Sequence, residues 1–222
     1  MNKRSGKPIL PAVLSLLFLL WTLAVIRLDI RPIGPEGSFV GLGALNGAFH
    51  RLTGVHMGLY ALTDWLGLLP LFIALGFALL GLGQLIRRKS LFKVDWDILI
   101  LGCFYVLVLA AFLFFETHII NYRPVLIGGV LEASYPSSTT LLILCIMPTA
   151  RRQLESRLRP GKLRRALSGG CLAFTFFMVA GRLISGVHWL SDIIGGILLS
   201  AALVTLYDCV CSLLTRLKTA KP

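Results

Sequence analysis

Six apolar segments, most of them close to the length that a helix needs to cross a bilayer, dominate the sequence. A membrane-spanning helix needs about 20 consecutive, mostly apolar residues. The composition agrees, with 56% hydrophobic residues, 14% charged residues and a mean hydropathy of +0.83. We therefore predict an all-α protein, a polytopic six-helix transmembrane bundle that forms one domain over residues 1–222. The six predicted spans are residues 9–26, 66–86, 98–115, 137–150, 167–183 and 189–214.

Two of these segments need comment. The fourth has only 14 residues, so we expect a buried helix whose flanking Arg151 and Arg152 extend to the headgroups. The first follows Lys3, Arg4 and Lys7, which is the charge order of a signal peptide, but it has no small-x-small cleavage site. We predict that it is retained as an anchor.

The basic residues separate between the two alternating sets of loops. Seventeen of the 22 Lys and Arg residues lie at the termini, after the second segment and after the fourth. Because such residues collect on the cytoplasmic side, we predict cytoplasmic termini. The same distribution accounts for the net charge of +12, so we expect no nucleic-acid partner. The five basic residues on the outer side are Arg27, Arg31, Arg51, Arg123 and Arg182.

The first outward loop, residues 29–63, contains Pro32, Pro35 and several glycines, then a mildly amphipathic stretch over residues 45–60. We expect that stretch to lie along the membrane surface.

The cysteines all fall inside or beside apolar segments, without a CxxC pair. We therefore expect neither a disulfide framework nor a metal site. They are Cys103, Cys145, Cys171, Cys209 and Cys211.

Polar residues recur at the predicted outer ends of four segments. Ionisable groups at membrane depth are costly and usually functional, so their convergence on one side indicates a shared site. The four groups are residues 121–124 (Asn-Tyr-Arg-Pro), 135–140 (Tyr-Pro-Ser-Ser-Thr-Thr), 181–182 (Gly-Arg) and 188–192 (His-Trp-Leu-Ser-Asp).

His188 and Asp192 have the spacing of a catalytic base and its orienting carboxylate. Four residues apart, they share one face of a helix. The carboxylate can accept from one ring nitrogen and leave the other as a lone pair directed at a substrate. Nucleophilic catalysis is therefore a candidate function of the pair.

Two further features favour a phosphate ligand. Residues 136–138 predict a helix start, whose N–H groups and positive dipole end attract an anion. Arg123 and Arg182 carry forked donors that suit phosphate oxygens. Together with His188 they suggest phosphoryl transfer through a histidine.

Each feature also has a purely structural interpretation. A His-x3-Asp pair can be a local hydrogen bond, an arginine at a helix end can anchor to headgroups, and Pro-Ser-Ser is a common helix cap. Only their order, spacing and shared side favour a site.

The same residues resemble the type 2 phosphatidic acid phosphatase superfamily of membrane lipid phosphatases. That family's pattern is KxxxxxxRP, then PSGH, then SRxxxxxHxxxD, and the resemblance covers roughly residues 116–192. The third motif matches most closely, because Arg182, His188 and Asp192 have its spacing, with Gly181 in place of its serine.

The resemblance implies a role for each matching residue. According to the resemblance, His188 is the nucleophile that becomes phosphorylated, and Asp192 orients it. Arg123 and Arg182 would bind the phosphate, together with the backbone around Ser137 and Ser138.

The implied function is a hydrolase of phospholipid metabolism or of the cell envelope. It would hydrolyse a lipid phosphate or pyrophosphate, undecaprenyl pyrophosphate-like or phosphatidylglycerol phosphate-like, at the outer face of a bacterial inner membrane. Membrane lipids would be its partners, and no metal or other cofactor is expected. The alternative is a relative without catalytic activity that binds or moves phosphorylated lipids.

Two motif positions depart from the family pattern. Glu116 stands where the first motif has lysine, and Thr139 stands at the catalytic position where the second has a histidine thought to protonate the leaving group. Threonine is too weak an acid for that role, and losing a general acid costs about 10²–10⁴ in rate. A pyrophosphate would suffer less, because its leaving group is a stable anion. His118 is a candidate substitute.

Overall fold

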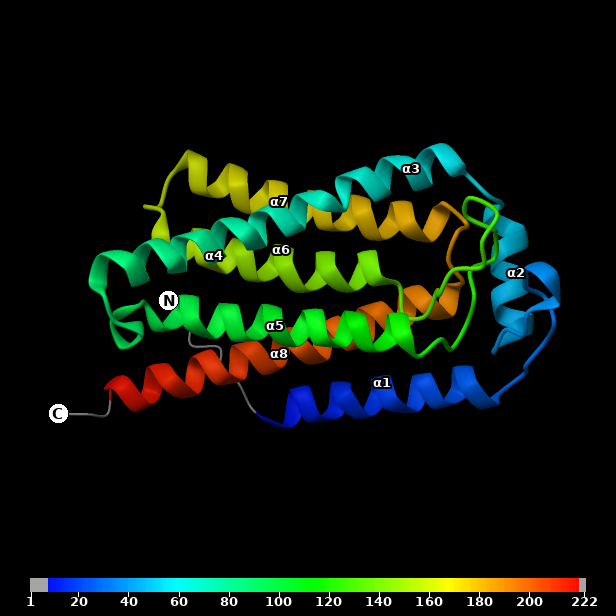
Figure 1. Cartoon of the computed structure of the whole chain (residues 1–222), viewed down its shortest axis with the longest axis horizontal. Coiled ribbons are helices and arrows are strands. Elements are labelled where there is room, and N and C mark those ends of the chain that lie inside the picture. The colour runs from blue at the N-terminus through cyan, green and yellow to red at the C-terminus, as the bar shows by residue number, and fades with distance from the viewer. Residues whose placement is uncertain (1–7, 220–222) are drawn as a thin grey trace.

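Eight α-helices and no β-strand make up residues 8–219, the part of the chain that the computed structural model describes (Figure 1). The predicted all-α class is confirmed. Two 3-10 helices, Pro35–Gly37 and Leu91–Lys93, lie in loops. The α-helices are α1 (Ile9–Arg27), α2 (Gly43–Thr53), α3 (Met57–Leu66), α4 (Leu68–Arg88), α5 (Trp96–Thr117), α6 (Ser138–Arg157), α7 (Lys162–Ile184) and α8 (Leu190–Thr219).

Five segments of the described chain, rather than six, are long and apolar enough to cross a membrane. α3 and α4 together form the second of them, so this segment begins well before the predicted residue 66. Their number and apolar character support a multi-pass membrane protein. The five segments are Ile9–Arg27, Met57–Arg88, Trp96–Thr117, Lys162–Ile184 and Leu190–Leu217.

α6 is the helix that the prediction counted as a sixth span and that is not among these five. It begins at Ser138, as the Pro-Ser-Ser sequence predicts, but continues past residue 150 to Arg157 through a polar stretch. α6 packs against α4, α5, α7 and α8 and runs through the middle of the bundle (Figure 1). Because these neighbours shield it from lipid, α6 needs less apolar surface than a lipid-facing helix.

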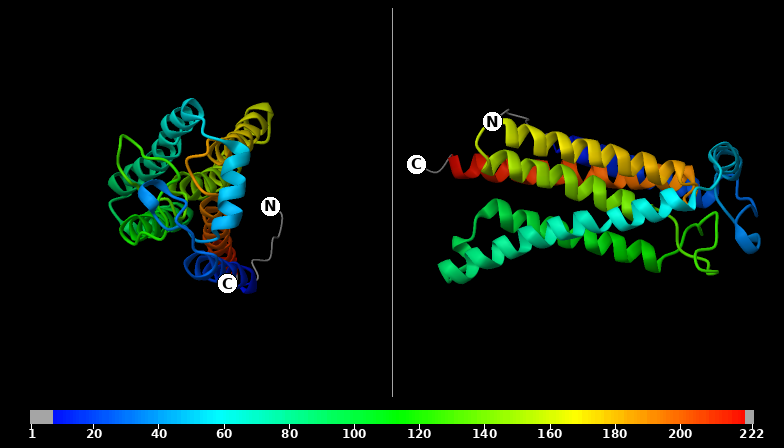
Figure 2. Two further views of the ribbon diagram at one scale, coloured as in Figure 1. Left: turned by 90° about the vertical axis from the view of Figure 1, so that its right-hand side faces the viewer. Right: turned by 90° about the horizontal axis from the view of Figure 1, so that it is seen from above.

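α2 lies across one end of the bundle, as both the side and end views show (Figures 1 and 2). The amphipathic stretch predicted over residues 45–60 is divided between α2 and α3, and α3 continues into α4 instead of following the surface. Asn46 on α2 is fully buried, accepts from the Ser191 N–H at 3.0 Å and donates to Ser191 Oγ at 2.9 Å. α2 therefore fixes the beginning of α8.

α1 holds the same region from the other side. It packs along α8, and Trp21 Nε1 donates to the Ser191 carbonyl at 3.1 Å. The next residue, Thr22, shares a hydrogen bond of 2.7 Å with the Tyr135 hydroxyl. The start of α8, through Ser191, and the loop before α6, through Tyr135, are thus both held by α1.

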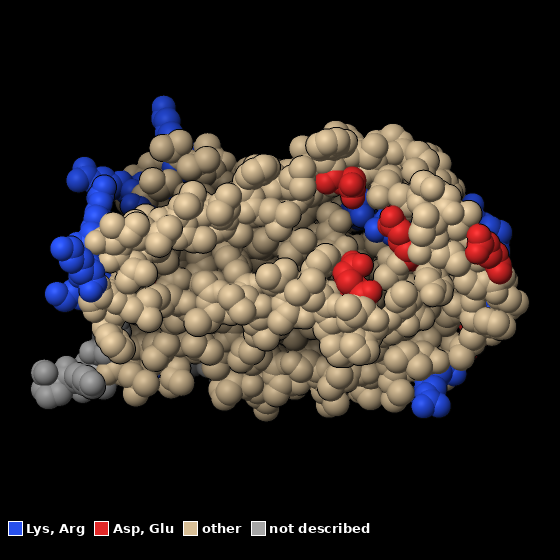
Figure 3. Space-filling model, in the orientation of Figure 1, with Lys and Arg blue, Asp and Glu red and all other residues tan. Residues whose placement is uncertain are grey.

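Basic side chains gather at the end of the bundle opposite α2 (Figure 3). Of the five basic residues that the sequence assigns to the outer side, Arg123 and Arg182 are buried. The exposed basic residues on that side are therefore Arg27, Arg31 and Arg51. This asymmetry is what the positive-inside rule requires. Lys3, Arg4, Lys7 and Lys221, which also entered that prediction, lie outside the described residues.

The turn between α7 and α8 has no room for a side chain at Gly186. Its φ is +69°, and a Cβ there would lie 1.8 Å from the Gly54 carbonyl oxygen. We expect Gly186→Ala to cost about 2–4 kcal/mol from backbone strain and overpacking, or roughly 5–10 °C in thermal midpoint for a chain of this size. Gly102→Ala is the control, because no atom lies within 4 Å of a Cβ there. Equal midpoints for the two variants would contradict the packing described.

Candidate active site

Two buried arginines lie under one aromatic ring at the α2 end of the bundle. Arg182, near the end of α7, is 1% exposed, and Arg123, in the loop between α5 and α6, is 9% exposed. Their guanidinium carbons lie 4.9 Å and 5.7 Å from the centre of the Tyr60 ring. Two positive charges so close together repel each other, and the ring face offsets only part of that cost.

Several N–H groups of these arginines have no hydrogen-bond partner among the described residues. They are Nε and Nη1 of Arg123 and Nε of Arg182. Glu132 Oε2 lies 3.1 Å from Arg123 Nε without a well-directed hydrogen bond. Unpaired buried donors are rare and call for an explanation such as a ligand, and forked N–H groups are suited to an anion with several oxygens.

His188 lies against this arginine pair. Its Nε2 is 3.3 Å from Nη2 of Arg182, and the imidazole is 3% exposed. A guanidinium can only donate, so Nε2 carries the lone pair and Nδ1 carries the proton. The ring nitrogen that carries the lone pair therefore faces Arg182.

Ser134 lies between His188 and Asp192. Its Oγ is 3.2 Å from His188 Nδ1 and donates a short hydrogen bond to Asp192 Oδ2. The direct distance from Nδ1 to that carboxylate oxygen is 3.8 Å. Asp192 thus orients the imidazole largely through the Ser134 hydroxyl, and it also accepts from the Trp189 N–H at 2.8 Å.

The first turn of α6 closes the site from the opposite side. The Ser137 N–H donates to the Asp192 carbonyl at 3.0 Å, so this N–H is engaged. The N–H groups that the helix start leaves for an anion are those of Ser138, Thr139 and Thr140. The Thr139 side chain faces the junction of α3 and α4, since a Cβ on Gly67 would lie 3.5 Å from its Cγ2.

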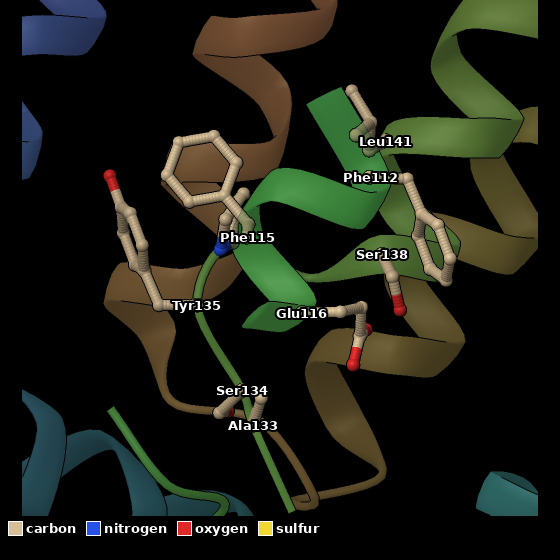
Figure 4. A pocket seen from close by; sticks show the side chains of 9 residues that line it. Phe112, Phe115, Glu116, Ala133, Ser134, Tyr135, Ser138 and Leu141 are labelled. Atoms are coloured by element: carbon tan, nitrogen blue, oxygen red, sulfur yellow. The ribbon is translucent and has the colours of Figure 1, made fainter. Parts of the chain in front are cut away.

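A pocket between α5 and α6 opens beside these residues (Figure 4). Ser134 and Ser138 line it together with Glu116 and apolar groups that include Phe112 and Leu141. Glu116, the residue in place of the expected lysine, points to the same side as Ser138 (Figure 4). His188, Arg123 and Arg182 do not line this pocket, and Ser134 is the lining residue that also contacts His188.

Sequence reasoning missed three of the residues that surround the predicted set. Ser134 precedes the second motif by two residues, and only its proximity to His188 and Asp192 reveals it. Tyr60 and Asp64 lie one turn apart on α3. Tyr60 is the last residue of the stretch that we expected along the membrane surface, and Asp64 lies beyond that stretch. α3 packs closely on α7, because a Cβ on Gly181 would lie 2.7 Å from Thr63 Cγ2, and this contact accounts for a glycine where the motif has serine.

His118, the candidate substitute for the missing histidine, has a local role. It is exposed, stacks on Phe114 with ring centres 4.3 Å apart, and its Nδ1 lies 2.9 Å from the Phe114 carbonyl. Its described contacts are with the last turn of α5.

Comparison with known sequences identifies a family for the segment that contains these residues. Residues 114–212, which contain all three motif regions, match the family model of the PAP2 superfamily. The resemblance inferred from the motifs is thereby confirmed. PAP2 is the type 2 phosphatidic acid phosphatase superfamily, and the matched segment runs from the end of α5 into α8.

A solved structure has the same fold. It is the crystal structure of a transmembrane PAP2-type phosphatidylglycerolphosphate phosphatase from Bacillus subtilis, which is 20% identical and superposes with a TM-score of 0.61 over 90% of this chain and 94% of that one. The two chains thus share a fold over most of their lengths, beyond the segment that the family model matches. No curated protein matches the sequence.

The surroundings of His188 predict how the stability of the protein depends on pH. Burial, reinforced by the charges of Arg123 and Arg182, lowers the pKa of His188 to about 4, although Asp192 acts in the opposite direction. The unfolded chain takes up this proton near pH 6.5, so folded His188 contributes stability above that pH and loses it as the pH falls toward 4.

We expect the thermal midpoint of the parent to decrease as the pH is lowered from 7 to 5. In His188→Asn this decrease should be smaller. His118→Asn is the matched control, because His118 is exposed. Equal slopes for the two variants would contradict a buried neutral His188.

Proposed function

We propose that this chain is a membrane lipid phosphatase that acts through a phosphohistidine. The observation that carries the proposal is the lone pair of His188 Nε2 directed at Arg182, which with Arg123 forms a buried pair whose N–H groups are partly unpaired. In this mechanism Nε2 attacks the phosphorus, the bond from phosphorus to the leaving oxygen breaks, and water then hydrolyses the phosphorus–nitrogen bond. Membership of the motif region in the PAP2 superfamily supports the same reaction.

The residues divide into three roles in this proposal. Arg123 and Arg182 bind the phosphate oxygens and stabilise the charge that develops on them in the transition state. Asp192 and Ser134 hold the imidazole in the Nδ1–H form and stabilise the positive charge that attack creates on the ring. The N–H groups at the start of α6 add to the binding of the anion.

Thr139 determines which leaving groups are feasible. The alkoxide that leaves from a phosphate monoester needs a proton, which a threonine hydroxyl does not supply near neutral pH. A pyrophosphate releases a phosphate that is stable as an anion, so an undecaprenyl pyrophosphate-like lipid suits the site better than a phosphatidylglycerol phosphate-like lipid on this criterion. The basic residues at the opposite end of the bundle support an outward-facing site, as in a bacterial inner membrane.

The alternative is a relative without catalytic activity that binds or moves phosphorylated lipids. Thr139 and Glu116 favour it, because one lacks a transferable proton and the other places a carboxylate near the anion site. The orientation of His188 favours the enzyme, because binding alone does not require a lone pair beside the arginines.

Phosphate release by the purified protein from lipid monophosphates and pyrophosphates tests the enzyme. We expect turnover in the parent, none with His188→Ala, and a gain of about 10²–10⁴ with Thr139→His on monoesters, where a general acid matters most. If neither the parent nor Thr139→His released phosphate while both still bound the lipids, the alternative would hold.

Ser134→Ala tests the indirect orientation of the imidazole. We expect kcat to fall roughly 10- to 100-fold with little change in KM, which is less than the ~10⁴ that follows loss of a whole orienting carboxylate. Ser156→Ala is the control, because this serine lies on the far part of α6, where its hydroxyl donates to the Gln153 carbonyl and accepts from Arg157. An unchanged kcat for Ser134→Ala would show that Asp192 orients His188 without the hydroxyl.

A further inference from the structure

The loop between α5 and α6 folds back on itself as a hairpin. Main-chain hydrogen bonds close its base, from the Arg123 N–H to the Glu132 carbonyl at 3.0 Å and from the Ser134 N–H to the Asn121 carbonyl at 2.9 Å. Its turn is Gly128–Gly129, where φ is +59° and +80°, and a two-residue turn with both φ values positive favours glycine. The hairpin therefore carries two site residues, Arg123 and Ser134, at its base.

The tip of this hairpin, residues 124–131, has no polar side chain. Its sequence is Pro-Val-Leu-Ile-Gly-Gly-Val-Leu, and the charged residues that flank it, Arg123 and Glu132, belong to the base. Val130 is 61% exposed and Leu126 is 38% exposed, whereas Arg123 is buried. A continuous apolar segment that leaves the core marks a surface for lipid or for another chain.

The base of the hairpin lies at the depth where a membrane span begins. The guanidinium carbon of Arg123 is 5.7 Å from the centre of the Tyr60 ring, and Tyr60 belongs to the first turn of the apolar span Met57–Arg88. Four residues of extended chain reach about 13 Å, so the turn of the hairpin stays close to that depth. Both side views agree, because the loop after α5 does not pass beyond α2 (Figures 1 and 2).

Two further features favour lipid as the partner of the tip. The end view shows the loop at the margin of the bundle, on the side of α4 and α5 (Figure 2), where the apolar surface of α5 ends with Leu113 and Phe114, each 52% exposed. Ile127 and Val130 also exchange main-chain hydrogen bonds of 3.2 Å and 3.1 Å. Peptide groups that are already paired enter an apolar medium at lower cost.

We propose that the tip, residues 124–131, inserts into the bilayer leaflet at the α2 end of the bundle and contacts its acyl chains. Segments held in this boundary typically reach about 5–10 Å into it. The insertion would hold the base of the hairpin, and with it Arg123 and Ser134, at a fixed depth relative to the lipid. The inference goes beyond the proposed function, because a relative without catalytic activity would carry the same anchor.

Photo-crosslinking of the full chain in phosphatidylcholine nanodiscs tests the insertion. The probe is 4-benzoylphenylalanine, which reacts with nearby C–H groups on irradiation, in place of Val130 or, in a second variant, of Leu126. Leu113 is the control position for lipid contact, because it is exposed on a membrane span, and Glu36 is the control for an exposed charged residue in another loop. Thermal midpoints equal to that of the parent show that the variants are folded.

We expect the tip to form phosphatidylcholine adducts in a yield comparable to that at Leu113 and about tenfold above that at Glu36, because an inserted segment meets acyl chains continually. Mass spectrometry of the adduct should place the new bond on an acyl chain. A bond confined to the headgroup, a crosslink to a second copy or within the chain, or a yield no higher than at Glu36 would each overturn the insertion. Phosphate release is measured separately, so a protein that forms the adduct without turnover would retain the anchor and remove the phosphatase.

Discussion

A buried carboxylate at the first turn of α8 joins the segments from which the site is built. Asp192 accepts hydrogen bonds from the Trp189 N–H and from Ser134, and its main-chain carbonyl accepts from the N–H of Ser137. An unpaired buried charge would cost several kcal/mol. Because these partners come from two segments, residues 134–137 before α6 and residue 189 before α8, the position of His188 depends on how these segments pack together, and the contacts of α1 and α2 with Ser191 hold the start of α8 in place.

Arg123 and Arg182 differ from Asp192, because they are buried with hydrogen-bond partners for only some of their N–H groups. Tyr60 and two partly exposed carboxylates stand beside Arg123 and Arg182. Holding two positive charges together lowers the stability of the folded protein. It favours the binding of an anion, because the charges are already in place when the anion arrives. Sites of this kind bind a ligand without having to rearrange.

The sequence predicts the parts of this structure that depend on contact with lipid or on local motif spacing. Helices in contact with lipid must be apolar, so five segments could be recognised from the sequence as membrane spans. The distribution of Lys and Arg assigned Arg123, Arg182 and His188 to the same end of the bundle. Contacts between distant segments leave no such signal. Ser134, Tyr60 and Asp64 matter only because α3 and the loop before α6 pack on α7 and α8, and α6 departs from the apolar pattern because protein surrounds it.

The polarity of α6 also bears on how the protein is assembled. A helix enters a bilayer unaided when its apolar residues outweigh its polar ones. α6 is not among the segments that are long and apolar enough to cross a membrane, because its later turns carry Arg151, Arg152 and Glu155, so we expect its insertion to depend on the helices that it packs against, α5 and α7 among them. The start of α6, which completes the site, is therefore in place only after its neighbours have been inserted.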